Sequence, residues 1–147
     1  IEKQPVPIHV HRAEAQGMCL VTQLSESDFV KHDADDTVQV GDVPIRILHT
    51  PGHTPGSQCF LVDNRLVAGD TLFVRGCGRV DLPGGDATQM YHTLTQRLSK
   101  LADDTVLYPG HDYGDAPTST LGEERRTNTY LQIRSLDDWT RLMGGWP

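Results

Sequence analysis

The sequence predicts an α/β domain built of two layers, a sheet and the helices that cover it. Short apolar runs separated by turn residues occupy the first half of the chain, and such runs are typical of β-strands. Helical patterns with capping signals come late, from Asp86 onward. One more compact apolar run, Thr105 to Tyr108, lies between those helices. This order of strands, helix, strand and helices favours helices packed on a sheet.

The strand segments are marked by alternation or by compact apolar runs. Gly41-Asp42 supplies a tight turn between two of them, and residues 63–65 connect another pair, so two hairpins are expected. A short helix over 12–20 and a helical turn over 25–32 are expected near the start of the chain. The expected strands are, in order, 6–10, 37–40, 43–50, 57–62, 66–68 and 105–108.

Three helices are expected in the later part of the chain. Asp86 with Gln89 and Thr120 with Glu123 resemble capping boxes, and Ser135 opens the third helix. The second helix is expected to run through residue 128, and the third to stop at residues 144–145, which are both glycine. The apolar stripes predicted for the first and third helices are Met90, Leu94, Leu98 and Leu101, and Leu136, Trp139 and Leu142.

Composition excludes several classes of protein. The chain has 147 residues, and 13 Lys and Arg against 20 Asp and Glu give a net charge of −7. An acidic surface repels nucleic-acid phosphates and anionic lipids, so neither is an expected partner. The three cysteines are widely spaced and form no Cys-x-x-Cys, which favours a reducing cytoplasm over a disulfide framework. No repeat divides the chain, and residues 1–147 are read as a single domain.

Three apolar strands share one feature at their ends: each stops at a glycine, and a side chain able to bind metal follows. These side chains are His53, Asp70 and His111. Loops after strand ends collect along one edge of a layered sheet, so we expect the three groups to meet there. Two imidazoles and a carboxylate suit Zn²⁺ or Fe²⁺. Any one of these segments alone is more often an ordinary turn, and it is their combination that predicts a metal site.

These segments resemble a known family. The runs Pro51-Gly-His-Thr-Pro-Gly-Ser57, Gly69-Asp-Thr-Leu-Phe73 and Tyr108-Pro-Gly-His111 look like the later signature motifs of the metallo-β-lactamase-fold superfamily. Within it, residues 75–79, 111–113 and 135–144, together with Ser119-Thr120, Glu123-Glu124 and Asn128, most resemble the persulfide dioxygenases. The glyoxalase II thioesterases are a close second. The resemblance covers nearly the whole chain.

The resemblance implies roles for individual residues. His53 would be a ligand of a first metal ion and Asp70 the carboxylate that bridges two ions in the hydrolases, or that completes a single iron site in the dioxygenases. His111 would bind the second ion in two-metal members and would be a supporting group in a one-iron enzyme. Arg79 and Tyr113 fall where glyoxalase II enzymes contact glutathione. Asp81 replaces a tyrosine of those enzymes, which argues against the same substrate.

The chain departs from the family in one motif. His-x-His-x-Asp-His is absent from the sequence, and Arg12 and Glu14 follow the pair His9 and His11 where the Asp-His would stand. We expect His9 and His11 to be exposed residues at a strand end, and His32 to face solvent. What remains resembles the second half of an αβ/βα sandwich, with the N-terminal half absent and the metal site incomplete.

Two consequences follow for partners and function. Half of a sandwich exposes an apolar sheet face, so pairing with another copy or with a missing upstream half is expected. The interpretation favoured is a metal-dependent enzyme acting on a glutathione-type substrate, similar to a persulfide dioxygenase, with Asp70 and His53 at its catalytic centre. A zinc-dependent glyoxalase II-like thioester hydrolase and a non-catalytic remnant or assembly module are the alternatives. Cys77 is expected to fill space rather than to react, His92 to face solvent and Trp139 to lie in the core.

Overall fold

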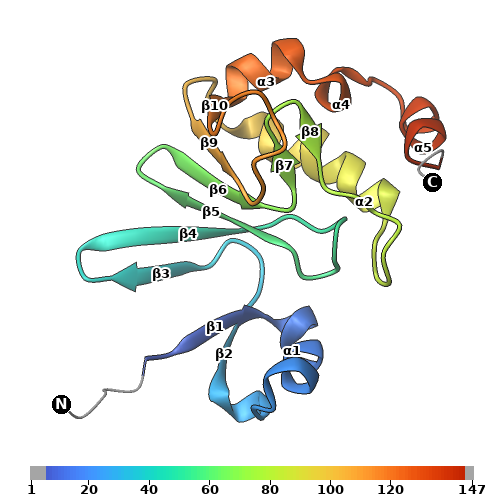
Figure 1. The fold of residues 1–147 in the computed structure, drawn as a ribbon. Helices are drawn as coiled ribbons and strands as arrows, with labels where there is room; N and C mark the ends of the chain where they lie inside the picture. Colours follow the sequence, from blue (N-terminus) through green and yellow to red (C-terminus); the bar gives the residue numbers. More distant parts are fainter. Residues whose placement is uncertain (1–5, 145–147) are drawn as a thin grey trace.

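The computed structural model describes residues 6–144 and contains a six-stranded sheet with helices on one of its faces (Figure 1). Every pair of neighbouring strands is antiparallel except β6 and β9, which run parallel. The strand order β10-β9-β6-β5-β4-β3 confirms the α/β class. The strands are β3 (Thr37–Val40), β4 (Val43–His49), β5 (Gln58–Val62), β6 (Arg65–Gly69), β9 (Val106–Pro109) and β10 (Ser119–Thr120).

Both hairpins predicted from turn residues are present. Val40 pairs with Val43 across Gly41, whose φ of 59° is the left-handed conformation that glycine adopts without strain. The second hairpin turns at Asp63 and Asn64, which also have positive φ, as the primed turns of two-residue hairpins require. The local turn chemistry therefore fixes the register of both hairpins.

The parallel pairing of β6 and β9 sets the position of the functional edge. Gly69 pairs with Pro109, and the amide of Gly110 donates a hydrogen bond of 2.9 Å to the carbonyl of Gly69. Because the strands are parallel, their carboxyl ends lie side by side at the same edge of the sheet. The segments that follow these two strands therefore begin as neighbours.

The helices pack on one face of the sheet and bury the main core. The caps are as expected: the carboxylate of Asp86 accepts from the amide of Gln89, and the hydroxyl of Thr120 accepts from the amide of Glu123. In the last helix, Trp139 and Met143 are buried whereas Leu142 is 39% exposed, so the predicted stripe was wrong at Leu142. Position 145, the second of the two predicted stop glycines, lies outside the described residues. The helices are α2 (Ala87–His92) with its π-helical and 3₁₀ continuation to Lys100, α3 (Leu121–Thr127), α4 (Thr129–Gln132) and α5 (Leu136–Gly144).

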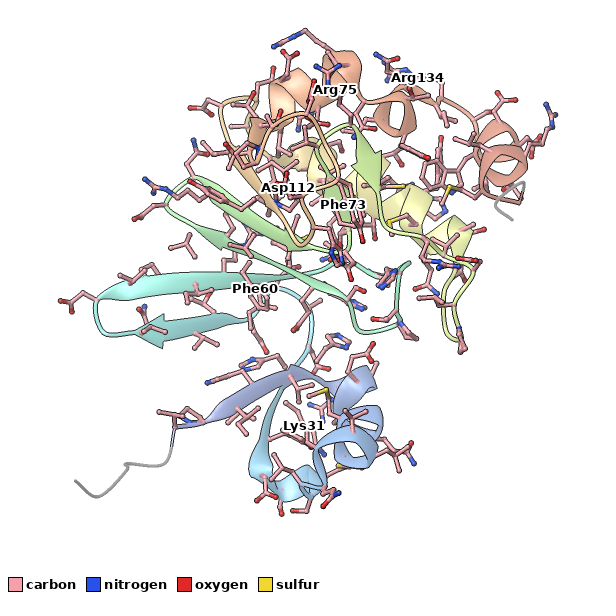
Figure 2. All side chains as sticks on the ribbon, viewed as in Figure 1. Lys31, Phe60, Phe73, Arg75, Asp112 and Arg134 are labelled. Atoms are coloured by element: carbon pink, nitrogen blue, oxygen red, sulfur yellow. The ribbon has the colours of Figure 1, made fainter. Side chains whose placement is uncertain are left out.

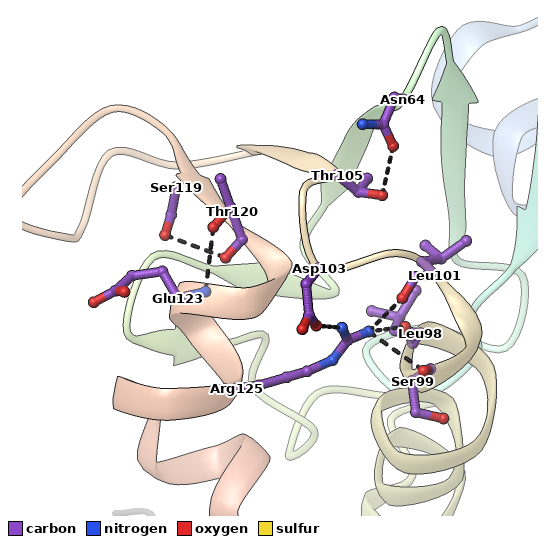
Figure 3. Close-up of polar contacts among 10 residues, drawn as sticks. All are labelled: Asn64, Leu98, Ser99, Leu101, Asp103, Thr105, Ser119, Thr120, Glu123 and Arg125. Carbon is purple, nitrogen blue, oxygen red and sulfur yellow. Dashed lines mark hydrogen bonds and ion pairs between the residues drawn. The ribbon is translucent and has the colours of Figure 1, made fainter.

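Arg125 of α3 fastens the helices to each other (Figure 3). Its guanidinium donates to the carbonyls of Leu98, Ser99 and Leu101 at 3.0, 3.3 and 2.8 Å and pairs with the carboxylate of Asp103. Carbonyls at the end of a helix lack partners within the helix, so a cation there satisfies them. Arg125 thereby joins α3 to the end of the α2 helix.

The N-terminal part forms a separate small layer on the other side of the sheet (Figure 1). It contains β1 (Ile8–His11), a 3₁₀ turn (Arg12–Glu14), α1 (Ala15–Thr22), a second 3₁₀ turn (Glu26–Asp28) and β2 (Phe29–His32). β1 and β2 pair in parallel, so the helical turn expected over 25–32 is confined to its first half and the rest is a strand. Val10, Ala15 and Phe29 form a core of their own.

The histidines of this layer differ from what the sequence led us to expect. His9 is exposed as predicted, but His11 and His32 are each only 8% exposed, so that prediction was wrong for both. His11 stacks on His49 of β4 with ring centroids 4.1 Å apart, and His32 lies between His9 and Asp36 in hydrogen bonds of 2.7 and 3.1 Å. Aromatic stacking and paired ring nitrogens permit this burial.

The sheet face away from α2 and α3 carries an apolar surface, which we call the open face. Cross-strand pairing places all its members on the same side, and they include Phe60, labelled in Figure 2. Its members are Val38, Val40, Val43, Ile45, Ile47, Phe60, Val62, Val67 and Tyr108. Part of it lines a groove of about 550 Å³ beside β1. No helix in the described part of the chain is long and apolar enough to span a membrane.

Candidate metal centre

Three loops deliver the predicted ligands to one edge of the sheet. His53 lies in the loop of residues 50–57, which joins β4 to β5, and Asp70 follows directly after β6. His111 comes two residues after β9, the strand parallel to β6. The sequence therefore brings the three side chains together by ending three strands of one sheet at the same edge.

The carboxylate of Asp70 contacts both imidazoles. His53 Nε2 lies 3.5 Å from Oδ2 of Asp70, and His111 Nε2 lies 3.1 Å from Oδ1. The expected convergence of these three groups is thus present in the structure. Each imidazole addresses a different carboxylate oxygen, the arrangement that a carboxylate shared between two cations would have.

The orientation of His53 is fixed by its other ring nitrogen. Nδ1 lies 2.8 Å from the carbonyl oxygen of Arg79, which can only accept, so Nδ1 carries the proton. Nε2, the atom directed at Asp70, is then the ring nitrogen left to bind a metal. A backbone acceptor on the far nitrogen is the usual way in which a protein orients an imidazole that binds metal.

Glycines allow the backbone to close around Asp70. A Cβ at Gly78 would overlap the carbonyl oxygen of Asp70, and one at Gly110 would come within 2.9 Å of its Oδ1. No side chain fits at such distances, so both positions require glycine for a steric reason. The approach of the three loops depends on these positions.

The donor set fits a metal only in part. Two ligands bound to one ion at about 2.1 Å stand roughly 3.0–3.4 Å apart, close to the separations of Asp70 from His53 and from His111. Across residues 6–144, however, no group of three or more His, Cys, Asp or Glu side chains is placed to hold an ion. The described residues therefore place one imidazole against each oxygen of Asp70, and a stable metal site needs more ligands than such a pair.

A cavity of about 300 Å³ opens beside these residues and is lined by all five predicted site residues. Arg79 forms a bidentate pair with Asp81 at 2.7 and 2.6 Å, and the hydrogen bond from Arg79 lowers the pKa of Asp81 to about 2. Tyr113 is exposed and stacks on His111, with ring centroids 4.8 Å apart. Both residues line the cavity, and their role in contacting substrate stays a prediction.

Sequence reasoning missed several residues that shape the cavity. Phe73 and Tyr130 line it, and the ring of Phe73 meets those of His111 and Tyr113 edge to face (Figure 2 labels Phe73). The signal for Phe73 was its place at the end of the segment that begins at Gly69. Tyr130 follows a helix break and gave no comparable signal.

Cys77 also lines the cavity, and its burial confirms that it fills space. Its side chain belongs to the main core, and the residue is 3% exposed. Burial raises the pKa of its thiol to about 12, so the reactive thiolate is absent near neutral pH.

Comparison with known proteins identifies the family. Residues 5–111 match the model of the metallo-beta-lactamase superfamily. The chain belongs to this superfamily. The resemblance on which the sequence analysis relied is thereby confirmed, and so is the sandwich-type fold class to which it pointed.

Two curated relatives place the chain within the superfamily. It is 34% identical to human mitochondrial persulfide dioxygenase ETHE1 over 128 residues. This match covers 85% of this chain and 50% of the human protein. It is 31% identical over 106 residues to PksB of Bacillus subtilis, described as a probable polyketide biosynthesis zinc-dependent hydrolase, with 72% and 47% covered. The chain thus spans about half the length of the curated relatives it matches.

Two solved structures share the fold. ETHE1 from Myxococcus xanthus superposes with a TM-score of 0.77 at 33% identity, covering 95% of this chain and 68% of that one. TTHA1623, solved in a di-iron-bound form, gives a TM-score of 0.65 at 30% identity, with 86% and 65% covered. Members of the superfamily similar to this chain therefore use zinc or iron. The human relative is mitochondrial by name, and the cytoplasmic location expected here stays a prediction.

Proposed function

We propose that this chain carries part of the metal centre of an enzyme that oxidises a thiol-derived persulfide of the glutathione type. The observation that carries the proposal is the meeting of His53, Asp70 and His111 at a cavity that Arg79 and Tyr113 also line. The similarity to persulfide dioxygenases of two organisms supports this choice of reaction.

Each residue has a task that its surroundings support. His53 and Asp70 would hold an iron ion, which supplies the redox chemistry for oxidation of the persulfide sulfur by O₂. The carbonyl of Arg79 keeps His53 in the tautomer that binds metal. The guanidinium of Arg79 and the ring of Tyr113 would orient the thiol-bearing half of the substrate, and the wall formed by Phe73 would exclude water from it.

A zinc-dependent thioester hydrolase is the second candidate. The observation in its favour is that the two oxygens of Asp70 face two different imidazoles, which suits a pair of metal ions. The zinc-dependent hydrolase among the relatives supports it as well. Bound zinc would supply an activated water for attack on the acyl carbon. A non-catalytic role is the third candidate, because the chain has no His-x-His-x-Asp-His.

We also propose that the open face is covered by a polypeptide segment that supplies the further metal ligands. About half of each relative lies outside the part that this chain matches, which is sufficient for a second layer. β1 and β2 form a lone parallel pair beside the open face, and parallel pairs ordinarily belong to larger buried sheets. A second copy of this chain would cover the face but would bring no new ligand motif.

Metal content and turnover of the protein, purified together with the segment that covers its open face, test these proposals. Near-stoichiometric iron with O₂ uptake on glutathione persulfide supports the dioxygenase. Zinc with hydrolysis of S-lactoylglutathione supports the hydrolase and overturns the first choice. Neither metal, even after addition of both, overturns both enzymes in favour of a non-catalytic role.

The matched variants for this test are Asp70→Asn and Asp63→Asn. Asp70→Asn removes the charge that both imidazoles face, so we expect metal content to fall at least about tenfold. Asp63 lies in an exposed turn with positive φ, which asparagine tolerates, so Asp63→Asn serves as the control. Equal metal content in the two variants would contradict a role for Asp70.

A further inference from the structure

The loop of residues 50–57 is held from outside the sheet by the N-terminal layer. Oε1 of Glu14 accepts a hydrogen bond of 2.6 Å from the backbone amide of Gly56, a residue 42 positions further along the chain. A charged acceptor strengthens such a bond, and its partial burial shields it from water. Glu14 ends the 3₁₀ turn after β1, so its position is set by a different layer from the one that carries the loop.

Steric contact reinforces this hydrogen bond. Gly56 is buried, and a Cβ there would overlap Cγ of Glu14 and come within 2.9 Å of Nδ1 of His11. The loop backbone therefore packs directly on the two side chains. Displacement of Glu14 removes both a hydrogen-bond acceptor and a packing surface from the same residue.

A second contact holds the loop one residue earlier. The ring of His49, at the end of β4, donates from Nε2 to the carbonyl of Pro55 at 2.8 Å. The same His49 ring also stacks on the ring of His11 in the N-terminal layer. Burial lowers the pKa of His11, with a further lowering from His49, so the stacked pair avoids adjacent positive charges near neutral pH.

The loop transmits these constraints because it is closed by hydrogen bonds of its own. The hydroxyl of Ser57 accepts from the amide of Thr54 at 3.0 Å and contacts its hydroxyl at 2.9 Å. The amide of Gly52 donates to the carbonyl of Thr54 at 3.2 Å. His53 lies between these residues, so a shift at Gly56 must either break the closed turn or move His53.

We propose that Glu14 is a positioning residue: by fixing the amide of Gly56 it holds the loop that aims His53 at Asp70. The proposal rests on the proposed function of His53 as a metal ligand. It assigns a task in the site to the N-terminal layer, which has no group at the cavity itself. The carboxylate of Glu14 touches no reacting atom and acts through the loop.

The test compares Glu14→Ala, Glu14→Gln and the control Glu26→Ala in the metal-free protein. Two readouts are used, the ring tautomer of His53 from long-range ¹H–¹⁵N spectra and hydrogen exchange at Gly56. In the unmodified protein we expect the Nδ1–H tautomer. Glu14→Ala should mix the tautomers and accelerate exchange at Gly56 about tenfold. Glu26 pairs with Lys31 on the surface of the same layer, so its loss should change neither readout.

Glu14→Gln distinguishes loss of the hydrogen bond to Gly56 from a general disturbance of the fold. Its amide oxygen can accept the same hydrogen bond, so it should restore the His53 tautomer and most of the protection at Gly56. An unchanged tautomer in Glu14→Ala, or failure of glutamine to rescue it, would overturn the proposal. Neither readout requires metal. A protein that binds neither iron nor zinc would therefore refute the proposed function while leaving the coupling of Glu14 to His53 measurable.

Discussion

At the scale of single residues, burial decides which cysteine can react. Cys59 is fully buried, and burial raises the pKa of its thiol to about 11 despite hydrogen bonds from Thr50 and Thr71 that act in the opposite direction. Cys77 has a thiol pKa of about 12 for the same reason. Cys19 lies partly exposed on α1. The three cysteines therefore differ in thiol reactivity, because only Cys19 is reached by water.

We predict that iodoacetamide at pH 8 modifies Cys19 in the native protein and leaves Cys59 and Cys77 unmodified. The cause is the lack of thiolate and of access at the two buried sites. Mass spectrometry of peptides after a time course gives the measurement, and the same reaction in urea is the control in which all three should react. Labelling of Cys77 at the rate of Cys19 would contradict the buried position described here.

We predict that the free energy of unfolding falls in alkali because of the thiols of Cys59 and Cys77. The pKa values of both thiols are raised in the folded state, so the folded protein retains protons that the unfolded chain releases. This contribution is complete below about pH 9 and is lost as the pH rises toward 11, at about 1.4 kcal/mol per pH unit and thiol. Urea unfolding between pH 8 and 10.5 measures it, and a constant midpoint would refute it.

At the scale of elements, the junction of α3 and α4 holds one wall of the cavity. The side-chain amide of Asn128 donates to the carbonyls of Phe73 and Gly76 at 3.3 and 3.0 Å, and its oxygen caps α4 at the amide of Tyr130. The neighbouring Glu124, 1% exposed, accepts from the amide of Arg75, whose φ is 58°. Two buried polar side chains therefore impose the turn between β7 (Leu72–Phe73) and β8 (Gly76–Cys77).

Replacement of Asn128 by alanine should destabilise the fold by about 2–3 kcal/mol, because a helix cap is lost and buried carbonyls lose their donor. Urea denaturation followed by tryptophan fluorescence measures the change. Glu123→Ala is the matched control, since Glu123 pairs with Arg126 at the surface of the same helix and should cost under about 0.5 kcal/mol. Equal effects of the two variants would show that the buried junction adds nothing.

The elements that sequence reasoning found are those whose signals are local. Gly41-Asp42 specified one hairpin, and Asp86 and Thr120 marked helix starts, because turns and caps depend on neighbouring residues. The strand at 29–32 was missed because its partner β1 lies 21 residues earlier and pairing over such a distance leaves no local pattern. The burial of His11 was missed for the same reason, since it depends on His49.

The site was predictable to a similar extent. His53, Asp70 and His111 were found because each follows a strand end and a glycine, and strand ends of one sheet edge must meet. Glu14 was not found, since its contribution arises from a contact between layers that no spacing in the sequence expresses. Phe73 ends a segment that was identified, but its ring contact with His111 leaves no pattern in the sequence.

At the scale of the whole molecule, the two faces of the sheet are unequal. One face is covered by helices, with Leu66 and Leu107 fully buried against them. On the open face Val40 and Val67 remain 59% and 46% exposed, and Tyr108 lies on the strand that leads to His111. A segment laid on the open face would therefore run toward the candidate metal centre. One such segment could both cover the apolar residues and supply the further metal ligands.

The chain on its own should accordingly self-associate through the open face, because contiguous apolar surface in water favours association. Val67→Glu places a charge on that face and should shift the protein toward monomer in light scattering coupled to size-exclusion chromatography. Val21→Glu is the matched control, because Val21 is 82% exposed on α1, away from the sheet. If the unmodified chain were a monodisperse monomer, or if both variants behaved alike, pairing of two copies through the open face would be ruled out.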